Sequence, residues 1–199
     1  MFHYLARDDV FRLETRRLWL RWPQADDAPA FAKLAGDWEV ARMTAALPHP
    51  YSLEEADHFI RWSREDNARG AALRFALTLK GGERETIGVV SVEGGMERPL
   101  LGYWLGRRYW GRGLASEAAQ STADAFFLFT GADELNALAL EENRASRAVL
   151  GKLGFTEDER LDAGPGRCAD SPTLRLVLRR GDWRARGASL PSGLRSVTA

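Results

Sequence analysis

This sequence is poor in the features that cross-link a chain or place it in a membrane. Among 199 residues there is one cysteine, Cys168, so an intramolecular disulfide is excluded and a reducing compartment fits. Cys168 has no histidine near it, which is typical of an inert thiol. No apolar run approaches the roughly 20 residues that span a bilayer, and early acidic residues argue against a signal peptide. We therefore expect a cytoplasmic protein that does not interact with membranes.

An excess of charge is also missing. Lys plus Arg total 28, and Asp plus Glu total 28. Because nucleic-acid-binding proteins usually carry a basic excess, no nucleic-acid partner is expected. The three histidines, His3, His49 and His58, are too scattered in the chain for a metal site. We expect no bound metal.

The apolar pattern that is present predicts one α/β domain. Alternating apolar residues indicate strands, and apolar residues three or four apart indicate helices. Strands that cluster in mid-chain imply antiparallel hairpins, and the later alternation of strand and helix implies a parallel crossover. We expect a domain over 1–183 and a polar, mobile tail over 184–199. The expected order is a strand over 12–22, helices over 26–34 and 52–66, strands over 73–80, 86–94 and 100–106, a helix over 114–130, a strand over 135–140, a helix over 143–155, and two strands flanking Pro165.

A glycine-rich turn stands between a predicted strand and a predicted helix, in the stretch RRYWGRGLASEAAQ over 107–120. Gly111 and Gly113 permit backbone conformations that other residues avoid, and a helix N-terminus adds unpaired N–H donors. This chemistry suits an anion, although a turn without a ligand is an alternative. A Walker loop would need lysine where Leu114 stands. A dinucleotide fingerprint would need glycine or alanine in place of Ser116 and a later acidic residue at a strand end.

The stretch RYWGRG over 108–113 fits Arg/Gln-x-x-Gly-x-Gly/Ala and resembles the acetyl-CoA signature of the GCN5-related N-acetyltransferase (GNAT) superfamily. The stretches IGVVSV, LGYWLGRRYWGRGLASEA and ENRASRAVLGKLGF are similar in order and spacing to its ribosomal-protein N-terminal acetyltransferase-like (RimJ/RimL-type) branch. The resemblance implies a GNAT fold. This is a central mixed, mostly antiparallel sheet of about six to seven strands with helices on both faces, splayed in the middle.

The resemblance also implies acetyl-CoA as the cosubstrate. Main-chain N–H groups of the glycine loop would hold its pyrophosphate, and the main chain of the strand ending at Leu105 would hold its pantetheine arm. An N–H near Leu105 would stabilise the oxyanion. The expected cofactor-binding residues are Trp104, Leu105, Arg108, Gly111, Arg112, Gly113, Leu114, Ala115, Asn143 and Ser146.

Ser146 is the expected catalytic residue, because a departing thiolate needs a proton or a hydrogen bond. The alternative is that Asn143 is only a helix N-cap and Ser146 only a first-turn residue. Members of the branch often carry an acid at the position of Leu100, so the general base stays open. The candidates for the acceptor site are His49, Tyr51, Glu93, Tyr103 and Glu141.

The expected function is transfer of an acetyl group from acetyl-CoA to a primary amine by direct attack. An α-amine, with a pKa near 7.7–8.0, is easier to neutralise than a lysine near 10.4. We therefore expect an α-amine of a peptide, protein or small molecule. The alternative, kept open by Leu100, is a catalytically silent GNAT-fold module that binds CoA or a partner. We expect the partner to be the amine acceptor and the protein itself to be a monomer or a homodimer.

Overall fold

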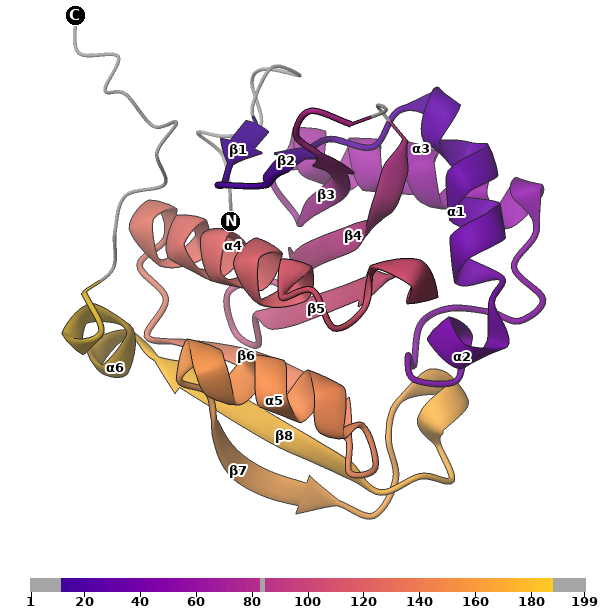
Figure 1. Cartoon of the computed structure of the whole chain (residues 1–199). Helices are drawn as coiled ribbons and strands as arrows, with labels where there is room; N and C mark the ends of the chain where they lie inside the picture. Colours follow the sequence, from indigo (N-terminus) through magenta and orange to yellow (C-terminus); the bar gives the residue numbers. More distant parts are fainter. Residues whose placement is uncertain (1–11, 83–84, 188–199) are drawn as a thin grey trace, which may run out of the picture.

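The computed structural model describes residues 12–82 and 85–187. The expected absence of a signal peptide concerns residues before 12, and most of the expected tail lies beyond 187, outside the described residues. Figure 1 shows the order of the elements. The strands are β1 Arg12–Glu14, β2 Leu18–Arg21, β3 Leu73–Leu79, β4 Thr86–Glu93, β5 Leu100–Leu105, β6 Glu134–Leu140, β7 Thr156–Leu161 and β8 Thr173–Arg179. The helices are α1 Ala28–Ala35, α2 Trp38–Ala41, α3 Leu53–Arg69, α4 Leu114–Phe129, α5 Arg144–Leu153 and α6 Arg180–Ala185.

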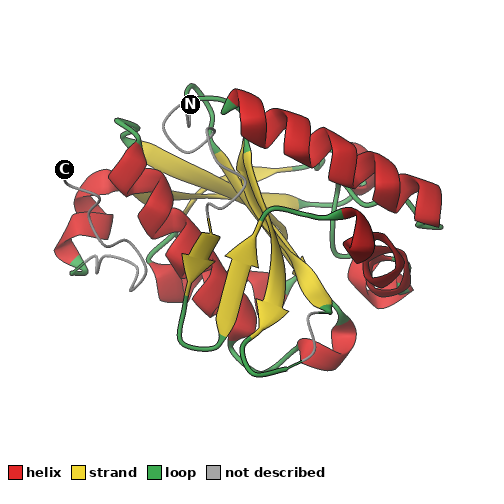
Figure 2. Ribbon diagram, turned by 90° about the horizontal axis from the view of Figure 1, so that it is seen from above, coloured by secondary structure: helices red, strands yellow, loops and turns green. Residues whose placement is uncertain are grey.

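The strands form one sheet in the order β1-β2-β3-β4-β5-β6-β8-β7. Only β5 and β6 pair in parallel; the other neighbours are antiparallel. Helices cover both faces, as Figure 2 shows. The expected mixed, mostly antiparallel architecture is therefore confirmed.

The strand number corrects the expectation, because the described residues form a sheet of eight strands where about six to seven are expected. The segment expected to be one strand over 12–22 folds back as the hairpin β1–β2. Its turn is closed by Thr15, whose N–H and hydroxyl both donate to the Leu18 carbonyl oxygen, at 3.0 and 3.2 Å. Four polar residues, Glu14 to Arg17, interrupt the apolar pattern here, but no glycine, proline or asparagine marks the turn.

The sheet opens between β5 and β6. Their pairing is limited to Leu100 opposite Asn136 and Leu101 opposite Ala137. The rest of β5 diverges from β6, which is the splay that the family resemblance implies. The sheet therefore has two halves, β1 to β5 and β6 to β8, joined by a short parallel contact.

Two apolar clusters hold the helices to the sheet. The larger cluster lies between the sheet and α4 and α5, and the smaller lies between the sheet and α1 and α3. The predicted helix boundaries reflect local chemistry: Ser52 caps α3 by accepting from the Glu55 N–H at 3.1 Å, and Gly154 ends α5 with φ 90°. The helices α2 and α6 are not predicted from the sequence. None of the described helices is long and apolar enough to cross a membrane.

Candidate active site

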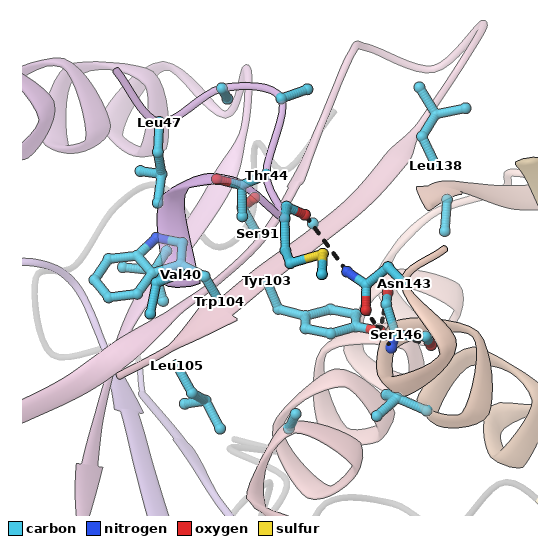
Figure 3. A pocket seen from close by; sticks show the side chains of 18 of the residues that line it. Val40, Thr44, Leu47, Ser91, Tyr103, Trp104, Leu105, Leu138, Asn143 and Ser146 are labelled. Atoms are coloured by element: carbon cyan, nitrogen blue, oxygen red, sulfur yellow. Dashed lines mark hydrogen bonds between the residues drawn. The ribbon is translucent and has the colours of Figure 1, made fainter. Parts of the chain in front are cut away.

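A cavity of about 830 Å³ lies at the opening between β5 and β6. Figure 3 shows part of its lining, which comes from the segment after α2, from β4 and β5, and from α5. Four predicted residues do not line it: His49, Arg108, Arg112 and Glu141. The predicted residues that do line it are Tyr51, Glu93, Tyr103, Trp104, Leu105, Gly111, Gly113, Leu114, Ala115, Asn143 and Ser146.

The glycine loop forms one end of the cavity. Gly111 and Gly113 have φ angles of 71° and 72°, which favour glycine. A Cβ added at Gly111 would meet no atom within 4 Å, so the space beside it is open. Among the described residues no side chain caps α4, and its first hydrogen bond runs from the Glu117 N–H to the Gly113 carbonyl oxygen at 3.2 Å. The N–H groups of the first turn of α4 are therefore available to an anion.

Glu117, in the first turn of α4, ties this loop to the β1–β2 hairpin. Its carboxylate accepts from the Thr15 hydroxyl at 2.6 Å, the Arg17 N–H at 2.7 Å and Arg17 Nε at 2.7 Å. Arg17 also donates to the Arg112 carbonyl oxygen at 2.8 Å. Burial raises the pKa of Glu117, but the hydrogen bonds from Thr15 and Arg17 outweigh it and lower the pKa overall. The carboxylate thus fixes the loop while it is ionised.

The arginine side chains of the loop lie away from the cavity lining. Arg108 pairs with Glu85 at 2.8 Å, and Arg112 is exposed. An anion at this end would therefore be held mainly by main-chain groups.

The edge of β5 lines the middle of the cavity. The Gly106 N–H donates to the Ile87 carbonyl oxygen at 3.0 Å, which fixes the register against β4. Because main-chain groups alternate in direction along a strand, those of Tyr103 and Leu105 face the opening. Trp110 Nε1 donates to the Leu105 carbonyl oxygen at 2.8 Å. The N–H of Leu105 and both groups of Tyr103 remain directed at whatever fills the opening.

Asn143, Ser146 and Tyr103 meet on the α5 side of the cavity (Figure 3). The Asn143 side chain accepts from the Ser146 N–H at 3.0 Å, so Asn143 is a helix N-cap. Its amide also donates to the Met43 carbonyl oxygen at 3.5 Å. The hydroxyl groups of Tyr103 and Ser146 are 2.9 Å apart. Burial raises the pKa of Tyr103 to about 12, although the bond with Ser146 lowers it, so the phenol is neutral near pH 7.

Glu93 lies toward the other end of the cavity, at the end of β4. Arg74 donates to its Oε2 at 2.6 Å, and the Ser91 hydroxyl donates weakly to its Oε1 at 3.3 Å. Arg74 is 3% exposed and also pairs with Asp66 at 2.7 Å. Leu100 on β5 is directly opposite Glu93. Leu100 stands where members of the branch often have an acid, and the Glu93 carboxylate thus lies beside that position on the neighbouring strand.

The remaining acceptor candidates differ in their surroundings. Tyr51 is buried, and burial together with the Glu55 charge raises its pKa to about 12. His49 is exposed and packs against Trp38, with ring centroids 5.1 Å apart. Glu141 pairs with Arg160 at 3.0 Å. Of this group, only Tyr51 faces the cavity.

Comparisons with known proteins identify the family of this chain. A family model described as Acetyltransferase (GNAT) domain matches residues 17–156. The chain belongs to this family. The uncharacterised N-acetyltransferase p20 of Bacillus licheniformis is 30% identical over 175 residues, which cover 84% of this chain and 96% of that protein. The predicted acyl-CoA-dependent acetyltransferase activity is therefore confirmed at the level of the family.

Solved GNAT structures share the fold. RimJ of Mycobacterium smegmatis, in complex with a CoA-disulfide, has a TM-score of 0.74 at 21% identity and covers 86% of this chain and 88% of its own. RimL, a ribosomal L7/L12 α-N-protein acetyltransferase in complex with coenzyme A, has a TM-score of 0.75 at 19% identity and covers 87% and 99%. These likenesses agree in fold with the branch that the sequence resembles.

Three residues that shape the cavity or its loop in this GNAT acetyltransferase are not predicted from the sequence. Trp110 stands within the loop motif, and Glu117 lies in the helix that follows it. Arg74 lies in a mostly apolar strand, LRFALTL. A charged residue within such a strand is the signal that could have drawn attention to it, because a buried charge needs a partner.

Proposed function

We propose that this acetyltransferase moves an acetyl group from acetyl-CoA to an α-amine of a peptide, protein or small molecule. One observation carries the proposal: a single cavity runs from the uncapped N-terminus of α4, past the open edge of β5, to the carboxylate of Glu93. It offers an anion site, a main-chain edge and an acid in that order. Acetyl-CoA supplies the acetyl group as a thioester.

The chain's own groups fit this cosubstrate. The pyrophosphate would be bound by main-chain N–H groups around Gly111, Gly113, Leu114 and Ala115. These groups lie either in the first turn of α4 or in the glycine loop, where the backbone can come close to a ligand. The open edge of β5 would hydrogen-bond the pantetheine arm. The Leu105 N–H, which faces the opening, would donate to the carbonyl oxygen as that oxygen gains negative charge.

Tyr103 and Ser146 would stabilise the leaving thiolate by hydrogen bonding. A thiol has a pKa of about 8.5 and Tyr103 about 12. Full transfer of the phenolic proton would therefore cost about 5 kcal/mol. The pair is better suited to donating a hydrogen bond through Ser146 than to giving up a proton. The proton that the thiol finally carries would come from the amine, by way of solvent.

Glu93 would receive the acceptor amine. Arg74 holds Oε2, so Oε1 is the oxygen left to face an amine. As nitrogen bonds to the carbonyl carbon and the C–S bond breaks, the amine loses a proton to Glu93 or to water. Neutralising a lysine near neutral pH costs about 4 kcal/mol, and an α-amine about 1 kcal/mol or less. A carboxylate that is already paired with arginine is better suited to accept the proton of an α-amine, which costs less to remove than that of a lysine. The name of the RimL relative, an α-N-protein acetyltransferase, supports the same choice.

The test uses two short peptides, one with a free N-terminus and no lysine, the other N-terminally blocked with one lysine. We expect faster release of CoA thiol with the free N-terminus. Ser146→Ala should lower turnover by roughly 10- to 1000-fold and leave acetyl-CoA affinity nearly unchanged. Faster transfer to the blocked lysine peptide would overturn the α-amine assignment. Binding of acetyl-CoA without transfer to any amine would support the silent module instead.

A further inference from the structure

The cavity has one wall made of apolar and aromatic side chains. In Figure 3, Val40, Leu47 and Trp104 gather on one side of the pocket, away from Ser146 and its helix. The wall comes from α2, the segment that follows it, α3, β4 and β5. We call it the apolar subsite, and its residues are Val40, Leu47, Tyr51, Phe59, Val89 and Trp104.

The apolar subsite is already built in the fold. Its side chains belong to the smaller core cluster, between the sheet and α1 and α3. Phe31, at the centre of that cluster, makes edge contacts with Phe59 at 5.7 Å and with Trp104 at 5.8 Å between ring centroids. Side chains fixed in this way lose little freedom when a ligand packs on them. The wall is therefore suited to bind a large apolar group, because its side chains are held in place and would not move in to fill the space beside a small one.

The charges near this wall restrict the ligand further. Glu55 and Glu93 both line the cavity, and Arg74 is already paired with Glu93 and with Asp66. A ligand carboxylate would meet two carboxylates and a guanidinium with its own partners. An amine beside Glu93 meets the opposite charge, and the high pKa of Tyr51 keeps that phenol neutral.

We propose that the acceptor is a hydrophobic primary amine, whose large aliphatic or aromatic group next to the nitrogen packs on the apolar subsite while the amine faces Glu93. This inference rests on the proposed function and adds the class of acceptor. In a peptide acceptor, it specifies the first side chain. The order of preference is Leu or Phe first, then Ser, then Asp.

The experiment compares four otherwise identical lysine-free peptides that begin with Leu, Phe, Ser or Asp, with release of CoA thiol as the readout. We expect kcat/KM for Leu and Phe to exceed that for Ser by at least about 10-fold, the size typical of one apolar pocket. Equal or faster reaction of the Ser or Asp peptide would overturn the inference and leave the proposed function standing. If no peptide reacts although acetyl-CoA still stabilises the enzyme, the proposed function itself fails, and this inference with it.

A pair of variants locates the preference. Leu47→Asn places an amide in the apolar subsite and should reduce the Leu-to-Ser ratio by about 10-fold, with an unchanged thermal shift from acetyl-CoA. Leu128→Asn is the matched control, because Leu128 is 40% exposed on α4 and does not line the cavity. Retention of the full ratio in folded Leu47→Asn would refute the subsite. The peptide ranking with the unaltered enzyme tests the proposal even if Leu47→Asn does not fold.

Discussion

At the scale of single residues, the site depends on which strand carries the acid. Leu100 departs from the branch pattern, and from the sequence alone it keeps open the alternative of an inactive module. In the folded sheet Glu93 is directly opposite Leu100 on the adjacent strand. Opposite residues on neighbouring antiparallel strands have Cβ atoms about 4.5–5.5 Å apart. One position can therefore supply the carboxylate that the other lacks.

This exchange can be tested by moving the carboxylate. Glu93→Gln keeps a hydrogen-bond acceptor for the buried Arg74 but removes the charge. We expect kcat/KM for the amine to fall roughly 100-fold, with acetyl-CoA affinity unchanged. Adding Leu100→Glu to Glu93→Gln should restore kcat/KM to at least about a tenth of the value of the unaltered enzyme. Adding Leu100→Gln instead should restore none of the lost activity. Full activity of Glu93→Gln would show that the amine reacts without this carboxylate.

At the scale of elements, the position of the glycine loop depends on hydrogen bonds from the β1–β2 hairpin. The loop itself supplies N–H groups, but the β1–β2 hairpin positions them through Thr15, Arg17 and Glu117. Hydrogen bonds to an ionised group each contribute about 1.5–3 kcal/mol. The hairpin turn, which no turn residue marks in the sequence, would thus also support the proposed cosubstrate site.

Glu117→Gln should destabilise the fold at neutral pH by about 1–2 kcal/mol and weaken acetyl-CoA binding. The native pKa of Glu117 is lowered, so its contribution is fully present above the unfolded value of about 4.3 and is lost as pH falls through the native value. The native protein should therefore lose more stability than Glu117→Gln between pH 6 and pH 3, measured by urea unfolding. Asp162→Asn, at an ion-paired carboxylate with a 98% exposed side chain, is the control and should change little. Parallel loss in native protein and Glu117→Gln would contradict the anchoring role.

At the scale of the whole molecule, the sequence predicts most elements but not how the sheet halves are joined. Periodicity identifies β3 to β6, β8 and four helices, because each buries one face or lies wholly in the core. The strand β7, TEDERL, is almost entirely exposed, so only its place before the Gly/Pro segment predicts it. Periodicity does not identify α6, which is too short to show a helical period. Nor does it show that Arg74 meets Glu93, since that contact follows from strand register. Near Gly111 and Gly113 it is the family motif, rather than periodicity, that predicts the loop, because the residues of the motif are adjacent in the sequence.

The two halves of the sheet share few strand contacts, and packing of α4 on α5 and on α6 helps to join them. The helix α4 packs on β1, β2, β4 and β5 of the first half, and α6 continues from β8 of the second. Trp183 on α6 is 6% exposed, stacks on Phe127 of α4 at 5.1 Å, and donates from Nε1 to Asp124 at 2.7 Å. Burial raises the pKa of Asp124, although the bonds from Trp183 and Gln120 lower it. Trp183 and Gln120 therefore offset part of the cost of burying the Asp124 carboxylate.

Trp183→Ala should lower the free energy of unfolding by about 3–5 kcal/mol, because it opens a cavity at the joint and removes a donor from a buried carboxylate. Trp183→Phe keeps the stacking and should cost about 1–3 kcal/mol, the share due to the lost donor. Because Trp183 donates to the ionised carboxylate and the native pKa of Asp124 is raised, the loss in Trp183→Phe should shrink as pH falls through that native pKa and Asp124 becomes protonated. Trp38→Ala, at a tryptophan that is 50% exposed, is the matched control and should cost less than about 1 kcal/mol. Urea unfolding from pH 4 to pH 8 measures all four proteins, and a similar loss in Trp38→Ala and Trp183→Ala would show that α6 does not join the halves.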